Sequence, residues 1–158
     1  MQHSIAATQT INSLRSLLQV HPGEKIKVYY RRMRSDLLAE VQSWANYSAI
    51  LCKASKFVES VPEAGESGRT QVFQPLEWGE FGIEVPAGSD LGKLRSSLEK
   101  KHSELLKHLE QTLKRLKNPD FIAKADPDLR QEMEDRVDNL TAQSKLLGGQ
   151  INLLEQAA

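Results

Sequence analysis

The chain has 158 residues, enough for one ordinary domain or for a small domain with an extension. Basic and acidic residues number 21 each, so the formal net charge is zero, and a hydrophobic share of 39% favours a folded protein over a disordered one. The single cysteine, Cys52, excludes an internal disulfide framework and a cysteine-rich zinc site, which is typical of a cytoplasmic protein. No segment approaches the roughly 20 apolar residues that a membrane-spanning helix needs, so we expect no membrane association.

The first part of the chain, residues 1–89, has the pattern of a small α/β unit. Apolar residues at mostly helical spacing predict a helix over residues 4–20, with Ser4 as its N-cap. A proline and a glycine predict a turn over residues 21–24. The alternation of polar and apolar residues that follows predicts a strand over residues 25–31.

A second helix is expected after the capping pair Ser35-Asp36. Short runs of strand-forming residues then predict strands over 57–61, 70–73 and 81–85, with a loop over 62–69. The first part of the chain should therefore place about two helices on one face of a small mixed sheet. The expected buried face of the second helix consists of Leu37, Leu38, Val41, Trp44, Ala45, Ile50 and Leu51.

The second part, residues 90–158, predicts an antiparallel helical hairpin. Two stretches carry apolar residues every three or four positions, and each predicts a helix of about 27 residues. Between them, Asn118-Pro119 and Asp126-Pro127 each place a capping residue before a proline, as at a helix start. The predicted fold class is α+β: a small mixed α/β unit followed by a long two-helix coiled coil. The stripes are Leu91, Leu94, Leu98, His102, Leu105, Leu109, Leu113 and Leu116, and Leu129, Met133, Val137, Leu140, Ser144, Leu147, Ile151 and Leu154.

The charges of the hairpin are unevenly divided. Residues 91–117 hold eight bases and three acids, a net charge of +5, whereas residues 127–158 have a net charge of −3. Lysines spaced by seven residues form one ridge opposite the leucine stripe, and a parallel row flanks it. Such a basic face is either an ordinary solvated surface or a contact surface for a polyanion. The ridge consists of Lys93, Lys100, Lys107 and Lys114, and the flanking row of Lys101, His108 and Arg115.

A second basic cluster ends the first predicted strand. Arg31, Arg32 and Arg34 follow directly after Tyr29 and Tyr30. The arginines could contact phosphates while a tyrosine stacks on a base or a sugar. The alternative is a strand end followed by a charged turn.

Signatures of catalysis and metal binding are missing from the sequence. The four histidines are dispersed, and no nucleotide-binding, hydrolase or zinc-protease motif occurs. Asp120, Asp126 and Asp128 near the hairpin tip could hold a magnesium ion, but helix capping and charge matching explain them more simply. His102 and Ser144 are tolerated polar positions of the two apolar stripes. We therefore expect no active site, metal ion or cofactor within this chain.

The turn between the two long helices carries a more specific pattern. Asn118, Phe121, the run Ala123-Lys124-Ala125 and Pro127 resemble the C-terminal helical-hairpin arm of valyl-tRNA synthetases, which are class I aminoacyl-tRNA synthetases. The segment 5–61 resembles the part of these enzymes that follows the anticodon-binding helices. The resemblance covers nearly the whole chain and is closest in the hairpin.

The resemblance implies a C-terminal tRNA-binding appendage of a valine–tRNA ligase, with a unit over residues 1–89 and an arm over residues 90–158. It implies tRNA as the partner, valine tRNA in particular, with contact at the outer corner where the D and T loops meet. ATP, Mg²⁺ and the catalytic centre would belong to the remaining domains of the synthetase, and the appendage would be a monomer. The expected tRNA contacts are Lys93, Lys100, Lys101, Lys107, Lys114, Arg115, Lys117 and Lys124, with Arg31, Arg32 and Arg34 as a second set.

A different class of function is compatible with the same hairpin, namely a coiled-coil module that mediates oligomerisation or docks on a protein partner. Such a module would form a stable oligomer through its leucine stripes and would not bind nucleic acid. Because one chain can already bury both stripes against each other, the pattern favours the tRNA-binding interpretation.

Overall fold

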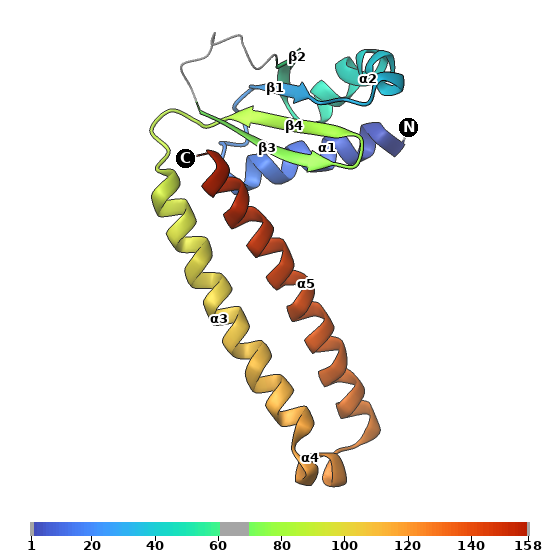
Figure 1. Ribbon diagram of the computed structural model, residues 1–158, viewed down its shortest axis with the longest axis vertical. Helices are drawn as coiled ribbons and strands as arrows, with labels where there is room; N and C mark the ends of the chain where they lie inside the picture. Colours follow the sequence, from blue (N-terminus) through green and yellow to red (C-terminus); the bar gives the residue numbers. More distant parts are fainter. Residues whose placement is uncertain (1, 61–69, 158) are drawn as a thin grey trace. The chain divides into compact units, whose positions relative to one another are not determined.

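The computed structural model of the protein describes residues 2–60 and 70–157 (Figure 1). The chain divides into two compact units, which are treated separately. The sheet unit extends to Asp90 and includes the end of the chain from Gln156, and the helical unit is Leu91–Glu155. None of the helices in the described residues combines the length and the apolar character that a membrane span requires.

Within the described residues, the sheet unit contains two α-helices, a short 3₁₀ helix and a four-stranded sheet. The strand order is β2-β1-β4-β3; β1 and β2 are parallel, and the other neighbours are antiparallel. The predicted α+β class with a mixed sheet is confirmed. The elements are α1 (Gln2–Leu17), β1 (Ile26–Arg31), η1 (Ser35–Leu37), α2 (Leu38–Leu51), β2 (Ala54–Glu59), β3 (Gln71–Leu76) and β4 (Gly79–Glu84).

Phe81 on β4 is the centre of the core of the sheet unit. Its ring packs edge-on against Phe57 and Trp78, with centroid distances of 6.4 and 5.6 Å, and lies 6.2 Å from the ring of Trp44 on α2. His3 on α1 in turn contacts Trp78 at 5.0 Å. Both helices therefore cover the sheet face that carries Phe81, as the sequence predicts.

The opposite face of the sheet is ordered by polar and cation–π contacts. Side chains alternate between the two faces of a strand, so this face carries Tyr29, Arg31, Phe73 and Gly82. The guanidinium of Arg31 lies 3.8 Å from the centroid of the Phe73 ring. The hydroxyl of Tyr29 donates a hydrogen bond to Glu84 at the end of β4. These contacts join β1 to β3 and β4 on the face of the sheet away from the helices.

A buried arginine links α1 to the starts of β1 and β2. Arg15 is 8% exposed and donates hydrogen bonds to the carbonyl oxygens of His21, Glu24 and Cys52, at 3.0, 2.9 and 3.4 Å. These carbonyls lie in the turn before β1 and at the end of α2. One side chain therefore holds both connections in place and satisfies acceptors that would otherwise be costly to bury.

The first helix differs from the prediction at both ends. α1 begins at Gln2 and ends at Leu17, whereas the sequence predicts a helix over residues 4–20. Ser4 lies inside the helix, so its predicted role as N-cap is wrong. The helix stops early because Gln19 has a left-handed backbone, with φ of 53°.

The buried face of α2 is also partly wrong in the prediction. Leu37 and Val41 are buried as expected, but Ile50 and Leu51 are 77% and 53% exposed. At 100° per residue, Ile50 lies on the side of the helix opposite Val41. Ser48 is buried instead, and its hydroxyl forms a hydrogen bond with a threonine of α1.

The predicted strands are present with different bounds. β1 agrees with the predicted strand 25–31 to within one residue. β2 begins at Ala54 rather than at residue 57, and position 61 and the predicted loop 62–69 lie outside the described residues. β3 and β4 extend beyond their predicted bounds toward each other, because they pair as one hairpin across all six residues of each strand.

The helical unit contains α3 (Leu91–Lys117), the short α4 (Pro119–Lys124) and, as far as Glu155, α5 (Pro127–Ala157). Figure 1 shows α3 and α5 side by side in opposite directions, with α4 at the end where the chain turns from one to the other. Side chains of the two predicted stripes are mostly half-buried, and no residue of α3 is fully buried. A hydrogen bond of 3.0 Å between His102 Nε2 and Ser144 Oγ joins the two helices. The polar positions of the two stripes are thus partners of each other.

We expect Gly82→Ala to destabilise the sheet unit. A methyl group on Gly82 would lie 2.6 Å from the ring of Phe73, on which Arg31 stacks, so that ring would have to move. Overpacking of this kind costs about 1–3 kcal/mol, which urea denaturation would detect as a lower midpoint. Gly23→Ala is the matched control, because its Cβ would meet the His21 ring at an ordinary 3.5 Å. Equal midpoints for the two variants would contradict the packing of Phe73.

Candidate nucleic-acid interface

α3 carries the lysine ridge along its length. The helix is continuous, so lysines seven residues apart are rotated by only about 20° and lie about 10.5 Å apart along the axis. The side chains of the predicted contact site on the helical unit are all exposed: Lys93, Lys100, Lys101, Lys107, Lys114, Arg115, Lys117 and Lys124. The structure therefore presents these cations to solvent as a set.

Two of the three acids of α3 have partners within the helical unit. Glu99 pairs with Arg95 at 2.8 Å, and Glu110 pairs with Lys114 at 3.0 Å. Arg95 also lies 3.4 Å from Glu155 on α5. These ion pairs are exposed and contribute little to stability. Lys114 can therefore exchange its carboxylate for a phosphate at small cost.

Lys100 and Lys107 are the middle lysines of the ridge. Among the described residues, neither takes part in an ion pair. Glu104 lies four residues after Lys100 and three before Lys107, and its exposed side chain falls between the ridge and the flanking row. This carboxylate weakens the attraction of anions to the centre of α3. A helical projection of the sequence would have shown its position.

The tip of the helical unit is closed by two capping side chains. The side-chain oxygen of Asn118 accepts a hydrogen bond of 3.0 Å from the Asp120 amide, and that of Asp126 accepts one of 3.2 Å from the Asp128 amide. The predicted capping roles of Asn118 and Asp126 are confirmed. Among the residues that the structure describes, no group of three or more His, Cys, Asp or Glu side chains is arranged to hold a metal ion.

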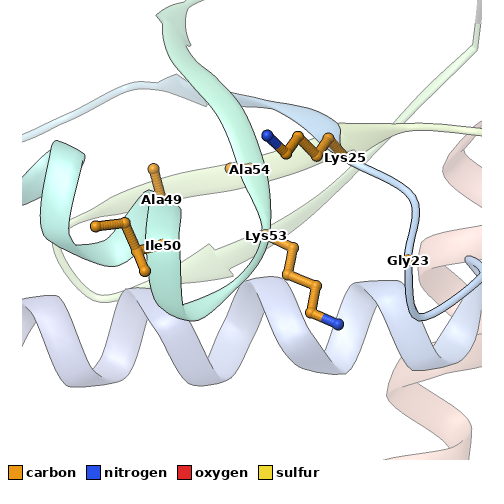
Figure 2. Close-up of a pocket in the computed structure, with 6 residues that line it drawn as sticks. All are labelled: Gly23, Lys25, Ala49, Ile50, Lys53 and Ala54. Carbon is orange, nitrogen blue, oxygen red and sulfur yellow. The ribbon is translucent and has the colours of Figure 1, made fainter.

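Further bases lie at the starts of β1 and β2, where the sequence pattern predicts no site. Lys25 and Lys53 line a hollow together with Ala49 and Ile50 (Figure 2). The side chain of Lys53 turns away from Ile50 and donates a hydrogen bond of 2.6 Å to the carbonyl of Pro22. The alternating pattern alone would have shown that Lys25 and Lys27 are exposed, but their grouping with Lys53 depends on strand pairing.

The arginine cluster at the end of β1 is engaged in ion pairs. Arg31 Nε and Arg32 Nη1 lie 2.5 and 3.1 Å from carboxylate oxygens of Glu80, and Arg34 Nε lies 2.7 Å from Asp36. A phosphate would compete with a carboxylate for each of the three arginines. Direct contact of this cluster with RNA stays a prediction, and the geometry supports it less than it supports the ridge.

Glu80 is the carboxylate that holds two of these arginines. Its partial burial works to raise its pKa, but the hydrogen bonds and charges of Arg31 and Arg32 outweigh burial and hold the pKa of Glu80 below its ordinary value. The unfolded chain lacks these contacts and takes up the proton at a higher pH. The stabilisation is therefore complete above the unfolded-state pKa and is lost as the pH falls through the folded-state pKa.

We expect Glu80→Gln to lower the free energy of unfolding by about 1–2 kcal/mol near neutral pH, because two charge-assisted hydrogen bonds are lost. In strong acid, where Glu80 of the parent protein is protonated, the two proteins should have similar stability. Urea denaturation over a series of pH values measures the difference. Asp36→Asn, at an exposed pair, is the control and should change stability much less. A difference for Glu80→Gln that does not depend on pH would rule out this electrostatic account.

The helical unit has relatives of known identity. Residues 90–155 match the family of the valyl tRNA synthetase tRNA binding arm. The valine–tRNA ligase of Aquifex aeolicus is 33% identical over 73% of this chain, and that of Parasynechococcus marenigrum is 29% identical over 90% of it. The chain spans 10% and 16% of the lengths of these two enzymes. The resemblance found in the sequence is confirmed: residues 90–155 belong to the family of valyl-tRNA synthetase tRNA-binding arms.

Proposed function

We propose that this chain is the tRNA-binding appendage of a valine–tRNA ligase and that the lysine ridge of α3 contacts the tRNA backbone. One observation carries the proposal: the region that matches the arm family contains a helix of net charge +5 whose ridge lysines are exposed. tRNA is a dense polyanion, and a basic ridge on a long helix can match its phosphates without reading its sequence.

In this proposal, α3 and α5 pack as an antiparallel two-helix coiled coil. The half-buried stripes and the contacts His102–Ser144 and Arg95–Glu155 support such packing. A polar pair in an apolar seam disfavours other registers, because a shifted helix would leave both groups without their partners. The coiled coil would keep the ridge straight over roughly 32 Å, enough to cross several phosphates at the outer corner of tRNA.

The activity of the relatives extends to this protein as part of the same proposal. We assign ATP, Mg²⁺ and the ligation of valine to the remaining domains of such an enzyme, and a binding role to this chain. Those domains would also select valine tRNA, because contacts to the tRNA backbone carry no sequence information directly. The enzyme would work in the cytoplasm, where charged tRNA is used.

Charge reversal in the middle of the ridge should weaken tRNA binding. In Lys100→Glu/Lys107→Glu, two phosphate contacts become repulsions, so we expect a loss of about tenfold or more in affinity for folded tRNA at low salt. Helix content, followed by circular dichroism, should not change, because both side chains are exposed. Titration with tRNA and with a duplex RNA of equal length measures the effect. Unchanged affinity would mean that the ridge is an ordinary solvated face.

Glu104→Gln makes the opposite change at the same place. It removes the negative charge beside Lys100 and Lys107 with little change in size or helix propensity, so tRNA affinity should rise about two- to fivefold. Glu132→Gln, at an exposed position of α5, is the control for loss of one negative charge elsewhere. A weaker affinity in Glu104→Gln than in the control would contradict the proposed role of the ridge.

The oligomeric state separates this proposal from a protein-interaction module. Stripes that cover each other within one chain should leave a monomer, so sedimentation should give a mass near 17.8 kDa. Leu106 and Leu146 are 44% and 59% exposed, and a self-associating module would use such residues. A stable dimer without affinity for tRNA would favour the coiled-coil interaction module.

A further inference from the structure

Four lysines from two distant segments gather where β1 and β2 begin. The parallel register places the Cα atoms of Lys27 and Lys56 opposite each other, next to the pair Ile26 and Ala54. All four lysine side chains are exposed. These residues, called the strand lysines below, are Lys25, Lys27, Lys53 and Lys56.

The strand lysines have little charge compensation of their own. Within the described part of the chain, no ion pair involves any of them. Lys53 donates to a neutral partner, the carbonyl of Pro22. Like charges directly opposite each other on neighbouring strands, as at Lys27 and Lys56, are unfavourable unless an anion lies between or over them.

Two acids lie near this surface but do not neutralise it. Glu24 and Glu84 line a second hollow together with Lys25 and Lys27. Glu84 accepts a hydrogen bond from Tyr29, which holds its carboxylate at the end of β4. Glu24 is exposed. Its charge therefore opposes any anion that approaches the two nearest lysines.

The backbone beneath the strand lysines is held in place. Arg15 donates hydrogen bonds to the carbonyls of Glu24 and Cys52, the residues directly before Lys25 and Lys53. The two strand starts are therefore fixed relative to each other by one buried side chain. A ligand that binds the lysines does not have to order this backbone, which lowers the entropic cost of binding.

We infer that the strand lysines form a second contact surface for the phosphate backbone of RNA. The inference rests on the proposed function, because the same tRNA is the ligand, and it adds a site on the sheet unit to the ridge on the helical unit. Charge complementarity selects this ligand: ammonium groups from strands roughly 5 Å apart can reach neighbouring phosphates as separate point charges. Beside two of them, Lys25 and Lys53, the side chains of Ala49 and Ile50 offer an apolar wall for a ribose or a base (Figure 2).

The position of β2 allows another explanation for the strand lysines, which the experiment must distinguish from RNA binding. β2 is an edge strand of the sheet, and lysines on an edge strand prevent it from pairing with other chains. If this were their function, their removal would increase association of the protein with itself. RNA affinity would then be unchanged.

The experiment compares the parent chain with three variants of it in titrations with folded tRNA between about 50 and 200 mM salt. In Lys27→Ala/Lys56→Ala, affinity should fall at every salt concentration, and the slope of log affinity against log salt should become shallower by about 1.5 units. Arg136→Ala/Lys145→Ala removes two exposed bases from acidic α5 and is the matched control for net charge. Its slope should equal that of the parent protein.

The third variant, Glu24→Gln, tests the same surface by a gain in tRNA affinity, which a loss of stability would not produce. Removal of this acid beside Lys25 should raise tRNA affinity. A slope for Lys27→Ala/Lys56→Ala equal to that of the α5 control would overturn the inference, and so would a dimer of that variant with unchanged tRNA affinity. If Lys100→Glu/Lys107→Glu loses affinity while the strand-lysine variant does not, the proposed function stands and this inference is wrong. If the parent chain does not bind tRNA at low salt, both are wrong.

Discussion

Ion pairs with carboxylates engage several arginines of this protein, whereas the lysines of both proposed RNA surfaces have exposed side chains. Arg31, Arg32 and Arg34 lie against Glu80 and Asp36, and the other arginines with described contacts lie against carboxylates, carbonyls or an aromatic ring. The planar guanidinium suits such partners, whereas the compact ammonium of lysine stays hydrated. Arginines therefore fix local structure, and lysines supply the exposed charge on α3 and at the starts of β1 and β2. Both proposed RNA surfaces depend on this division.

The helices of the helical unit can be predicted from local sequence patterns. The reason is that each of them is stabilised mainly by one apolar stripe. A long helix without a fully buried residue gains stability from one half-buried stripe, and most of its circumference remains in water. The stripe and the capping residues Asn118 and Asp126 act over at most one or two turns, so they are visible in the sequence. The solvated side can carry a charge pattern with little effect on folding. A binding surface and a fold can therefore be encoded in the same segment on different faces.

In the sheet unit, the sequence predicts the helices and strands better than it predicts the contacts between them. The ion pair between Arg31 and Glu80 joins residues 49 positions apart, so the basic cluster shows no carboxylate partner when the sequence is read locally. The juxtaposition of Lys27 and Lys56 likewise depends on the parallel pairing of two strands separated by a helix. Ser48 is buried with a hydrogen-bond partner on the neighbouring helix α1, which spacing along α2 does not indicate. Tertiary contacts, and not local preference, decide these positions.

The aromatic residues are divided between the two units. Trp44 and Trp78 both lie against Phe81 in the sheet unit, and all three tyrosines belong to the same unit. The helical unit, Leu91–Glu155, contains no tryptophan and no tyrosine. Intrinsic tryptophan fluorescence therefore comes from the core of the sheet unit alone, whereas α3 and α5 contribute most of the helical backbone signal. Because each unit has its own optical signature, unfolding curves recorded with the two probes need not coincide. Their separation would measure how far the sheet unit and the tRNA-binding arm fold as independent bodies.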